Sequence, residues 1–184
     1  VGGELAAWKA TDSRRMLAFS SVGQLGLMTL ALASGQHLGI MAAVALAVHH
    51  LLVKSALFLL VDRTDGFQAT WPVKVIFVLL VLSLAGIPPL PGFWAKLLLL
   101  QAWLQNGGVL AYVTLIVVLL TTVIEVMYLL RFAVMLKDSR PDPVDDRLSM
   151  LNRAIAIALG ILLIPAMLLL QPLHEQISRM ASQL

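Results

Sequence analysis

The chain contains no cysteine and few charged residues for its size. None of its 184 residues is cysteine, which excludes a disulfide scaffold, a thiolate zinc site and a cysteine-ligated iron–sulfur cluster. Only 12% of the residues are charged and 60% are hydrophobic, against about 25% and 45–50% in soluble domains. The mean hydropathy is +0.92. These values exclude a soluble fold and a disordered chain, and they indicate a polytopic membrane protein.

Apolar runs separated by short polar segments fill most of the sequence. A helix rises about 1.5 Å per residue, so about 20 residues cross the hydrocarbon core of a bilayer. The runs lack the strict alternation of barrel strands, and only helices or closed barrels satisfy their backbone groups in lipid. We therefore predict an all-α membrane bundle of about five transmembrane helices. The runs cover roughly 16–34, 38–61, 73–104, 109–136 and 151–170.

The third run is too long for one straight span and contains a cluster of helix breakers. Three prolines and two glycines fall within seven residues, and such a segment cannot propagate an α-helix. An irregular turn survives at membrane depth only when it is buried in protein or lines a cavity. We predict a discontinuous helix over 73–104, broken at Gly86, Pro88, Pro89, Pro91 and Gly92.

The organisation expected along the chain has four parts. Residues 1–15 form a polar segment on the cytoplasmic side, and 16–136 form a four-helix transmembrane unit. Residues 137–150 form a second cytoplasmic-side loop, and 151–184 form a final transmembrane helix and an outward-facing tail. Because the chain starts at Val1 without an apolar leader, we expect it to be the C-terminal piece of a longer protein.

Basic residues of the polar segments lie almost entirely on one side. Nine basic residues lie in segments on one side of the membrane, and only Arg179 lies in a segment on the other. This bias predicts that the nine are cytoplasmic and that the C-terminus faces outward. We expect an integral protein of the bacterial plasma (inner) membrane. Because these residues anchor loops and form no stripe with stacking aromatics, a nucleic-acid partner is excluded. The nine are Lys9, Arg14, Arg15, Arg63, Lys74, Lys137, Arg140, Arg147 and Arg153.

Five ionisable residues lie inside the apolar runs, close to the expected membrane midplane. They are His49, His50, Lys54, Lys96 and Glu125. A charged group there costs at least about 2.5–3.5 kcal/mol on insertion scales, so each one calls for an explanation. His50 and Lys54 are separated by four residues and share one face of a helix. Lys96 follows the predicted break by one to two turns.

Such a row of residues fits the handling of protons or cations. Histidine passes protons between its two ring nitrogens, and a broken helix offers free carbonyl groups to water or ions. The first run adds a supporting polar stripe of Ser20, Ser21 and Gln24. Taken singly, these residues are equally consistent with interhelical hydrogen bonds and salt bridges, including a Glu125–Arg131 pair.

Three stretches, 12–26, 49–59 and 85–96, resemble helices of the proton-conducting antiporter-like subunits, the first of them at the opening of a helix. This family comprises the large membrane-arm subunits of respiratory complex I, the A and D subunits of Mrp-type cation/proton antiporters, and the equivalents in membrane-bound hydrogenases. The stretch from His49 to Leu59 is similar to the family's His/Lys helix. The stretch from Ala85 to Lys96 is similar to its second broken helix, and the resemblance covers roughly 12–136.

The resemblance implies a subunit of about fourteen helices with two inverted five-helix repeats. This chain then holds most of the second repeat and the last helix, while the first repeat lies outside it. By the same resemblance Lys54 is the middle lysine of a proton relay, and Lys96 is the terminal residue that exchanges with the outside or with the next subunit. His50 lies between relay members.

The residues also depart from the complex I pattern. Many relatives carry a histidine where this chain has Leu46, whereas the His49–His50 doublet and Glu125 are closer to Mrp-type and hydrogenase-linked relatives. We expect translocation of protons, or exchange of Na⁺ for H⁺, through Lys54, His50, His49, Lys96 and Glu125. The expected partners are other membrane subunits and the lipid bilayer. No catalytic residue, cofactor or metal site is expected, and the sequence has no dinucleotide-binding glycine pattern.

Two alternatives remain open. In one, the chain belongs to a proton-pumping subunit of an NADH:quinone oxidoreductase in the respiratory chain. In the other, it is a structural membrane subunit with no ion flux of its own, and its buried charges hold the bundle together.

Overall fold

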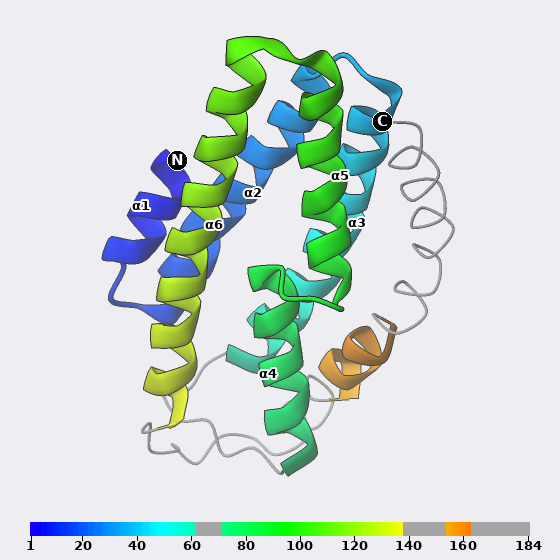
Figure 1. The fold of residues 1–184 in the computed structure, drawn as a ribbon. Helices are drawn as coiled ribbons and strands as arrows, with labels where there is room; N and C mark the ends of the chain where they lie inside the picture. Colours follow the sequence, from blue (N-terminus) through cyan, green and yellow to red (C-terminus); the bar gives the residue numbers. More distant parts are fainter. Residues whose placement is uncertain (62–70, 138–153, 163–184) are drawn as a thin grey trace.

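The computed structural model describes residues 1–61, 71–137 and 154–162. These ranges are helical apart from short turns, with no strand among them, which confirms the predicted all-α fold (Figure 1). Of the expected loop at 137–150 only Lys137 is described, and it ends the last long helix; most of the expected final helix and tail over 151–184 also lies outside the described residues. The helices are α1 (Gly2–Lys9), α2 (Ser13–Ala33), α3 (His37–Val61), α4 (Trp71–Ala85), α5 (Pro91–Asn106) and α6 (Gly108–Lys137), followed by a helical segment at 154–162.

Local sequence signals set the ends of these helices. Asp12 caps α2, because its side-chain oxygen accepts a hydrogen bond from the Arg15 amide at 3.1 Å. Pro91 occupies the first turn of α5, where its fixed φ fits a helix and its missing N–H has no intrahelical role. Gly107 ends α5 with φ at +63°, a conformation that favours glycine, and the chain then reverses into α6.

Three of the described helices are long and apolar enough to cross a membrane, namely Ser13–Ala33, His37–Val61 and Gly108–Val134. A further crossing is built from two shorter pieces. Figure 1 shows α4 and α5 arranged one above the other beside α6, joined at mid-height by a non-helical turn. The predicted discontinuous helix is therefore confirmed.

The break is shorter than predicted. Residues 86–90 are non-helical, whereas Pro91 and Gly92 already belong to the first turn of α5. Proline is a strong helix breaker only in a helix interior, and at the first position it starts a helix instead. The predicted break therefore extended too far at its C-terminal end, because Pro91 and Gly92 belong to α5.

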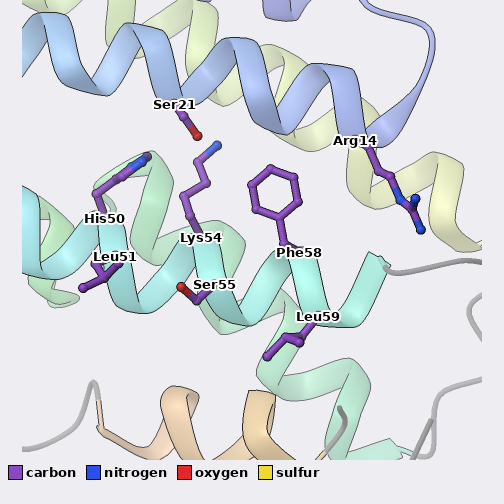
Figure 2. A pocket seen from close by; sticks show the side chains of 8 residues that line it. All are labelled: Arg14, Ser21, His50, Leu51, Lys54, Ser55, Phe58 and Leu59. Atoms are coloured by element: carbon purple, nitrogen blue, oxygen red, sulfur yellow. The ribbon is translucent and has the colours of Figure 1, made fainter. Parts of the chain in front are cut away.

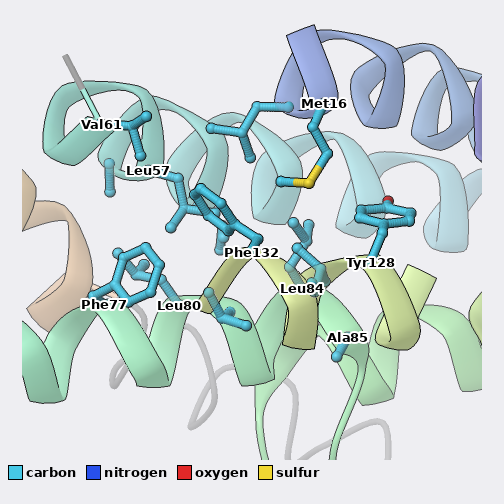
Figure 3. Close-up of a cluster of buried hydrophobic side chains, with 14 of the residues drawn as sticks. Met16, Leu57, Val61, Phe77, Leu80, Leu84, Ala85, Tyr128 and Phe132 are labelled. Carbon is cyan, nitrogen blue, oxygen red and sulfur yellow. The ribbon is translucent and has the colours of Figure 1, made fainter. Parts of the chain in front are cut away.

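The core is divided into two apolar clusters at different heights. The lower cluster packs α4 against α3 and the C-terminal half of α6 (Figure 3). Within it, the rings of Phe77 and Phe132 meet edge to face at a centroid distance of 5.4 Å. Its larger members include Met16, Leu57, Phe77, Leu80, Leu84, Tyr128 and Phe132. The upper cluster joins α2, α3, α5 and the start of α6 through Leu27, Leu46, Leu98, Leu99, Trp103 and Val118.

Buried polar residues gather around the level where the two clusters meet. On α6, for example, Thr121 and Glu125 fall between Val118 of the upper cluster and Tyr128 of the lower one. We call this level the polar layer. It comprises Ser20, Gln24, His49, Lys54, Ser83, Lys96, Thr121 and Glu125.

The short helix α1 packs against α2 and α6. Glycines permit its close approach, since a Cβ added at Gly3 would lie 2.5 Å from the backbone nitrogen of Gly23. Arg131 of α6 donates a hydrogen bond to the Ala10 carbonyl at 2.7 Å, just beyond the end of α1. The polar segment expected at 1–15 thus contains a helix that contributes buried residues, Glu4 and Ala7, to the bundle.

Candidate functional site

The centre of the polar layer is an ion pair between α5 and α6. The Lys96 ammonium lies 2.5 Å from Oε2 of Glu125, and the two side chains are only 8% and 1% exposed. The other carboxylate oxygen, Oε1, accepts a hydrogen bond from Nε2 of Gln24 on α2 at 2.7 Å. Both oxygens of the buried carboxylate are therefore occupied. The Glu125–Arg131 pairing considered from the sequence is not formed.

Lys96 also binds the broken helix directly. Its ammonium donates to the carbonyl oxygens of Leu84 at 3.2 Å and Ala85 at 3.4 Å. In a continuous helix these carbonyls would accept from the amides of residues 88 and 89, but both positions are proline and have no N–H. The two prolines thus release the two acceptors that the lysine uses.

Gly86 makes room for this contact. Its φ is +78°, and a Cβ placed on it would lie 3.1 Å from Cδ of Lys96, closer than ordinary van der Waals contact. The Lys96 side chain therefore runs along the backbone of the break. A cation held by helix-end carbonyls on one side and a carboxylate on the other is sensitive to any change of charge or backbone at the break.

His49 lies on the other side of the same break. Its Nε2 is 2.8 Å from the hydroxyl oxygen of Ser83 on α4. A Cβ added at Gly92 would overlap the Ser83 carbonyl oxygen and approach Cε1 of His49 to 2.8 Å. His49 is thus packed into the junction of α4 and α5, without a direct hydrogen bond to Lys96.

Lys54 forms a separate polar group, on the interface of α2 and α3. It is 3% exposed, and its ammonium donates to the Leu17 carbonyl at 3.0 Å. Ser21 donates to the same carbonyl, also at 3.0 Å. The Leu17 carbonyl belongs to a helix interior and already serves the backbone ladder, so it is a weak partner for a buried ammonium.

A cavity of about 680 Å³ opens beside Lys54. Figure 2 shows the Lys54 side chain pointing across it toward Ser21, with His50 one helical turn away on the same side of α3. The buried Nδ1 of His50 has no hydrogen-bond partner among the described residues. Such an orphaned nitrogen suits a water molecule or a transferred proton. The lining residues are Arg14, Ser21, His50, Leu51, Lys54, Ser55, Phe58 and Leu59.

The sequence analysis missed a third polar group, at α1. Glu4 is 2% exposed, and its Oε2 lies 2.7 Å from the hydroxyl of Tyr128. That hydroxyl is also 2.7 Å from Oγ of Ser20. The signals available were the Gly2-Gly3-Glu4 start, which permits close helix packing, and the placement of Tyr128 one turn after Glu125. Neither signal predicted a buried Glu4, because the polar composition of residues 1–15 indicated an exposed segment.

One face of α2 connects the three groups. Leu17, Ser20, Ser21 and Gln24 follow the i, i+3, i+4, i+7 spacing of a single helix face. Through this face α2 contacts Lys54, then Tyr128 with Glu4, and then Glu125 with Lys96. The polar stripe predicted from the sequence is therefore the element that joins ionisable residues of four other helices.

The sequence of residues 1–124 matches the family described as NADH:quinone oxidoreductase/Mrp antiporter, transmembrane. Among similar proteins, NADH-quinone oxidoreductase subunit N 1 of Roseiflexus castenholzii is 32% identical over 88% of this chain and 35% of the relative. NAD(P)H-quinone oxidoreductase subunit 2 of Gloeobacter violaceus is 29% identical over 78% of this chain and 30% of the relative. The chain thus spans about a third of the length of these relatives.

Two solved structures show the same arrangement of helices. A chain of respiratory complex I from Thermus thermophilus superimposes with a TM-score of 0.71 at 26% identity, over 91% of this chain and 40% of the other. A chain of the Mrp complex from Dietzia sp. DQ12-45-1b gives a TM-score of 0.65 at 26% identity, over 90% of this chain and 21% of the other. The chain is an integral membrane protein that belongs to the NADH:quinone oxidoreductase/Mrp antiporter transmembrane family.

Proposed function

We propose that this chain conducts protons, or exchanges Na⁺ for H⁺, as part of a longer antiporter-like subunit. The observation that carries the proposal is the buried Lys96–Glu125 pair, which is held against the open carbonyls of a broken helix. A structural ion pair has no need of the break. A lysine that must gain and lose its proton does benefit from acceptors whose position depends on an irregular backbone.

The proposed relay runs from the cavity side to the break. Lys54 and His50 face the cavity, where water can deliver or remove protons, while Lys96 and Glu125 are buried and are not among its lining residues. His49 lies beside the break, next to Ser83. Transfer of a proton onto Glu125 would weaken its hold on Lys96, and this coupling is what moves charge through the polar layer.

We infer that the whole protein works in a multisubunit membrane complex. The relatives named as NADH-quinone oxidoreductase subunits favour a redox-driven complex of the respiratory chain over a stand-alone antiporter. The coupling reaction would then take place in partner subunits. The nine-to-one bias of basic residues supports a bacterial plasma membrane location with the C-terminus outward. Within this arrangement we propose 16–136 as the conducting unit.

The decisive experiment replaces Lys96 in the full-length subunit. Lys96→Ala should abolish coupled proton transport in membrane vesicles while the complex still assembles. Lys74→Ala is the matched control, since Lys74 is an exposed lysine of α4. Acidification of Lys96→Ala vesicles at the wild-type rate would rule the proposal out.

Lys54→Met separates a relay from a purely structural role. The structural alternative is favoured by one observation, the hydrogen bond of Lys54 to a carbonyl of the neighbouring helix. If Lys54 only ties α3 to α2, the methionine variant loses assembly in proportion to its loss of flux. If Lys54 carries protons, the variant assembles normally, because methionine fills the same volume, and transport stops.

A further inference from the structure

Glu4 is a buried acid that the relay described above does not use. Only 2% of its surface is exposed, and its carboxylate packs on the Cα of Gly23, where any added Cβ would overlap it. Its Oε2 is held by the Tyr128 hydroxyl. No cation lies within ion-pair distance of Glu4 in the part of the chain that the structure describes. A buried carboxylate without a counter-ion is costly, and binding a proton relieves that cost.

The surroundings of Glu4 connect it to both ends of the relay. It interacts electrostatically with Glu125, Lys96 and Lys54. The Tyr128 hydroxyl that binds Glu4 also contacts Ser20 of α2. Along α2, Ser20 lies between Leu17, whose carbonyl binds Lys54, and Gln24, whose amide binds Glu125. Glu4 is thus linked through Tyr128 and Ser20 to the face of α2 that contacts both Lys54 and Glu125.

The ionisation of Glu4 fits this position. Burial raises the pKa of the Glu4 carboxyl to about 7, and the negative charge of Glu125 adds to the rise. The Tyr128 hydrogen bond and the charges of Lys96 and Lys54 oppose the rise. A change of charge on any of these neighbours therefore changes the proton affinity of Glu4.

We propose that Glu4 is a proton-binding residue of the relay, coupled to Lys54 and to the Lys96–Glu125 pair across α2 and α6. In the transfer from Lys54, the ammonium loses an N–H bond and the Glu4 carboxylate gains an O–H bond, so two opposite charges become two neutral groups. The proton then passes to the Glu125 carboxylate: the O–H bond of Glu4 breaks, an O–H bond forms on Glu125, the negative charge returns to Glu4, and neutral Lys54 regains a proton from the cavity side. The inference rests on the proposed function, because without proton flux Glu4 would only anchor α1.

Glu4→Gln in the full-length subunit within its complex tests the inference. Glutamine keeps the size of the side chain and an oxygen that accepts from Tyr128, but it cannot bind a proton. We expect normal assembly, proton flux in vesicles lowered by about tenfold or more, and loss of the change in flux around the pKa of Glu4. Asp12→Asn is the matched control, because Asp12 is an exposed carboxylate of the same segment and asparagine caps a helix equally well.

A spectroscopic measurement distinguishes a titrating residue from an anchor. The pH-difference infrared spectrum of the purified complex should contain a protonated-carboxyl C=O band that Glu4→Gln removes and Asp12→Asn leaves in place. Wild-type flux, an unchanged pH profile and an unchanged band in Glu4→Gln would overturn the inference.

Two further variants keep the result interpretable. If Glu4→Gln fails to assemble, Tyr128→Phe decides, since it removes the hydroxyl between Glu4 and Ser20 and keeps the ring in the lower cluster. Slower flux with Tyr128→Phe supports the inference and wild-type flux rejects it. Lys96→Ala is measured in parallel. Full flux in Lys96→Ala defeats the proposed function itself, whereas its loss combined with an unaffected Glu4→Gln defeats only the role of Glu4.

Discussion

Gln24 of α2 donates a hydrogen bond to one oxygen of Glu125, and the other oxygen is bound by Lys96. The amide therefore fixes the direction in which the carboxylate faces. Because Gln24 carries no charge, it can hold Glu125 in both its ionised and protonated forms. The geometry of the ion pair depends on a neutral neighbour from a third helix.

Gln24→Ala should destabilise the bundle. The substitution leaves Oε1 of a 1% exposed glutamate without a donor, and an unsatisfied buried group of this kind costs about 1–3 kcal/mol. Thermal unfolding of the purified full-length subunit in detergent measures the effect. Thr29→Ala on the same helix is the control, since Thr29 is exposed and bonds only to the nearby Gly26 carbonyl. Equal stability of the two variants would show that the Gln24 hydrogen bond is energetically unimportant.

Gly23→Ala should displace Glu4, whereas Gly26→Ala should have little effect. A Cβ at Gly23 meets the Glu4 carboxylate, but a Cβ at Gly26 meets nothing within 4 Å. Both substitutions raise helix propensity equally, so their difference isolates the contact with α1. We expect lower stability and slower proton flux for Gly23→Ala alone. The idea that α1 must pack closely on α2 is contradicted if both variants behave like the wild type.

Gly86→Ala and Gly35→Ala form a second matched pair. Both glycines have positive φ, at +78° and +69°, so alanine costs roughly 1–2 kcal/mol of backbone strain at either position. Only at Gly86 does the new methyl group also approach the Lys96 side chain, while at Gly35 it meets open space. Similar losses of stability are expected, with a loss of transport in Gly86→Ala only. Comparable transport in both variants, measured per assembled complex, would mean that the Lys96 side chain tolerates displacement from the break.

The fold was predictable because hydrophobic runs and helix breakers act locally. Run lengths gave the spans, and the prolines near residue 88 gave the break. The C-terminal end of the break was misplaced, because a proline such as Pro91 breaks a helix from within but is favourable in its first turn. The pairing of Lys96 with Glu125 could not be derived from the sequence, since it depends on how α5 and α6 are aligned across a hairpin.

Glu4 was missed for a different reason. A carboxylate in a short polar segment is expected to be exposed, and its burial depends on Gly23, which is nineteen residues away on another helix. The partners of His49 and Lys54 were equally out of reach, because a serine hydroxyl and a main-chain carbonyl leave no periodic signal in the sequence. The polar face of α2, in contrast, followed directly from its spacing.

The two apolar clusters above and below the polar layer have a consequence for leakage. Each cluster consists of apolar side chains, so a charge in the polar layer would lose its hydrogen-bonding partners on moving through either of them. In the proposed relay, charge would therefore enter the polar layer through the cavity beside Lys54 and not through either apolar cluster.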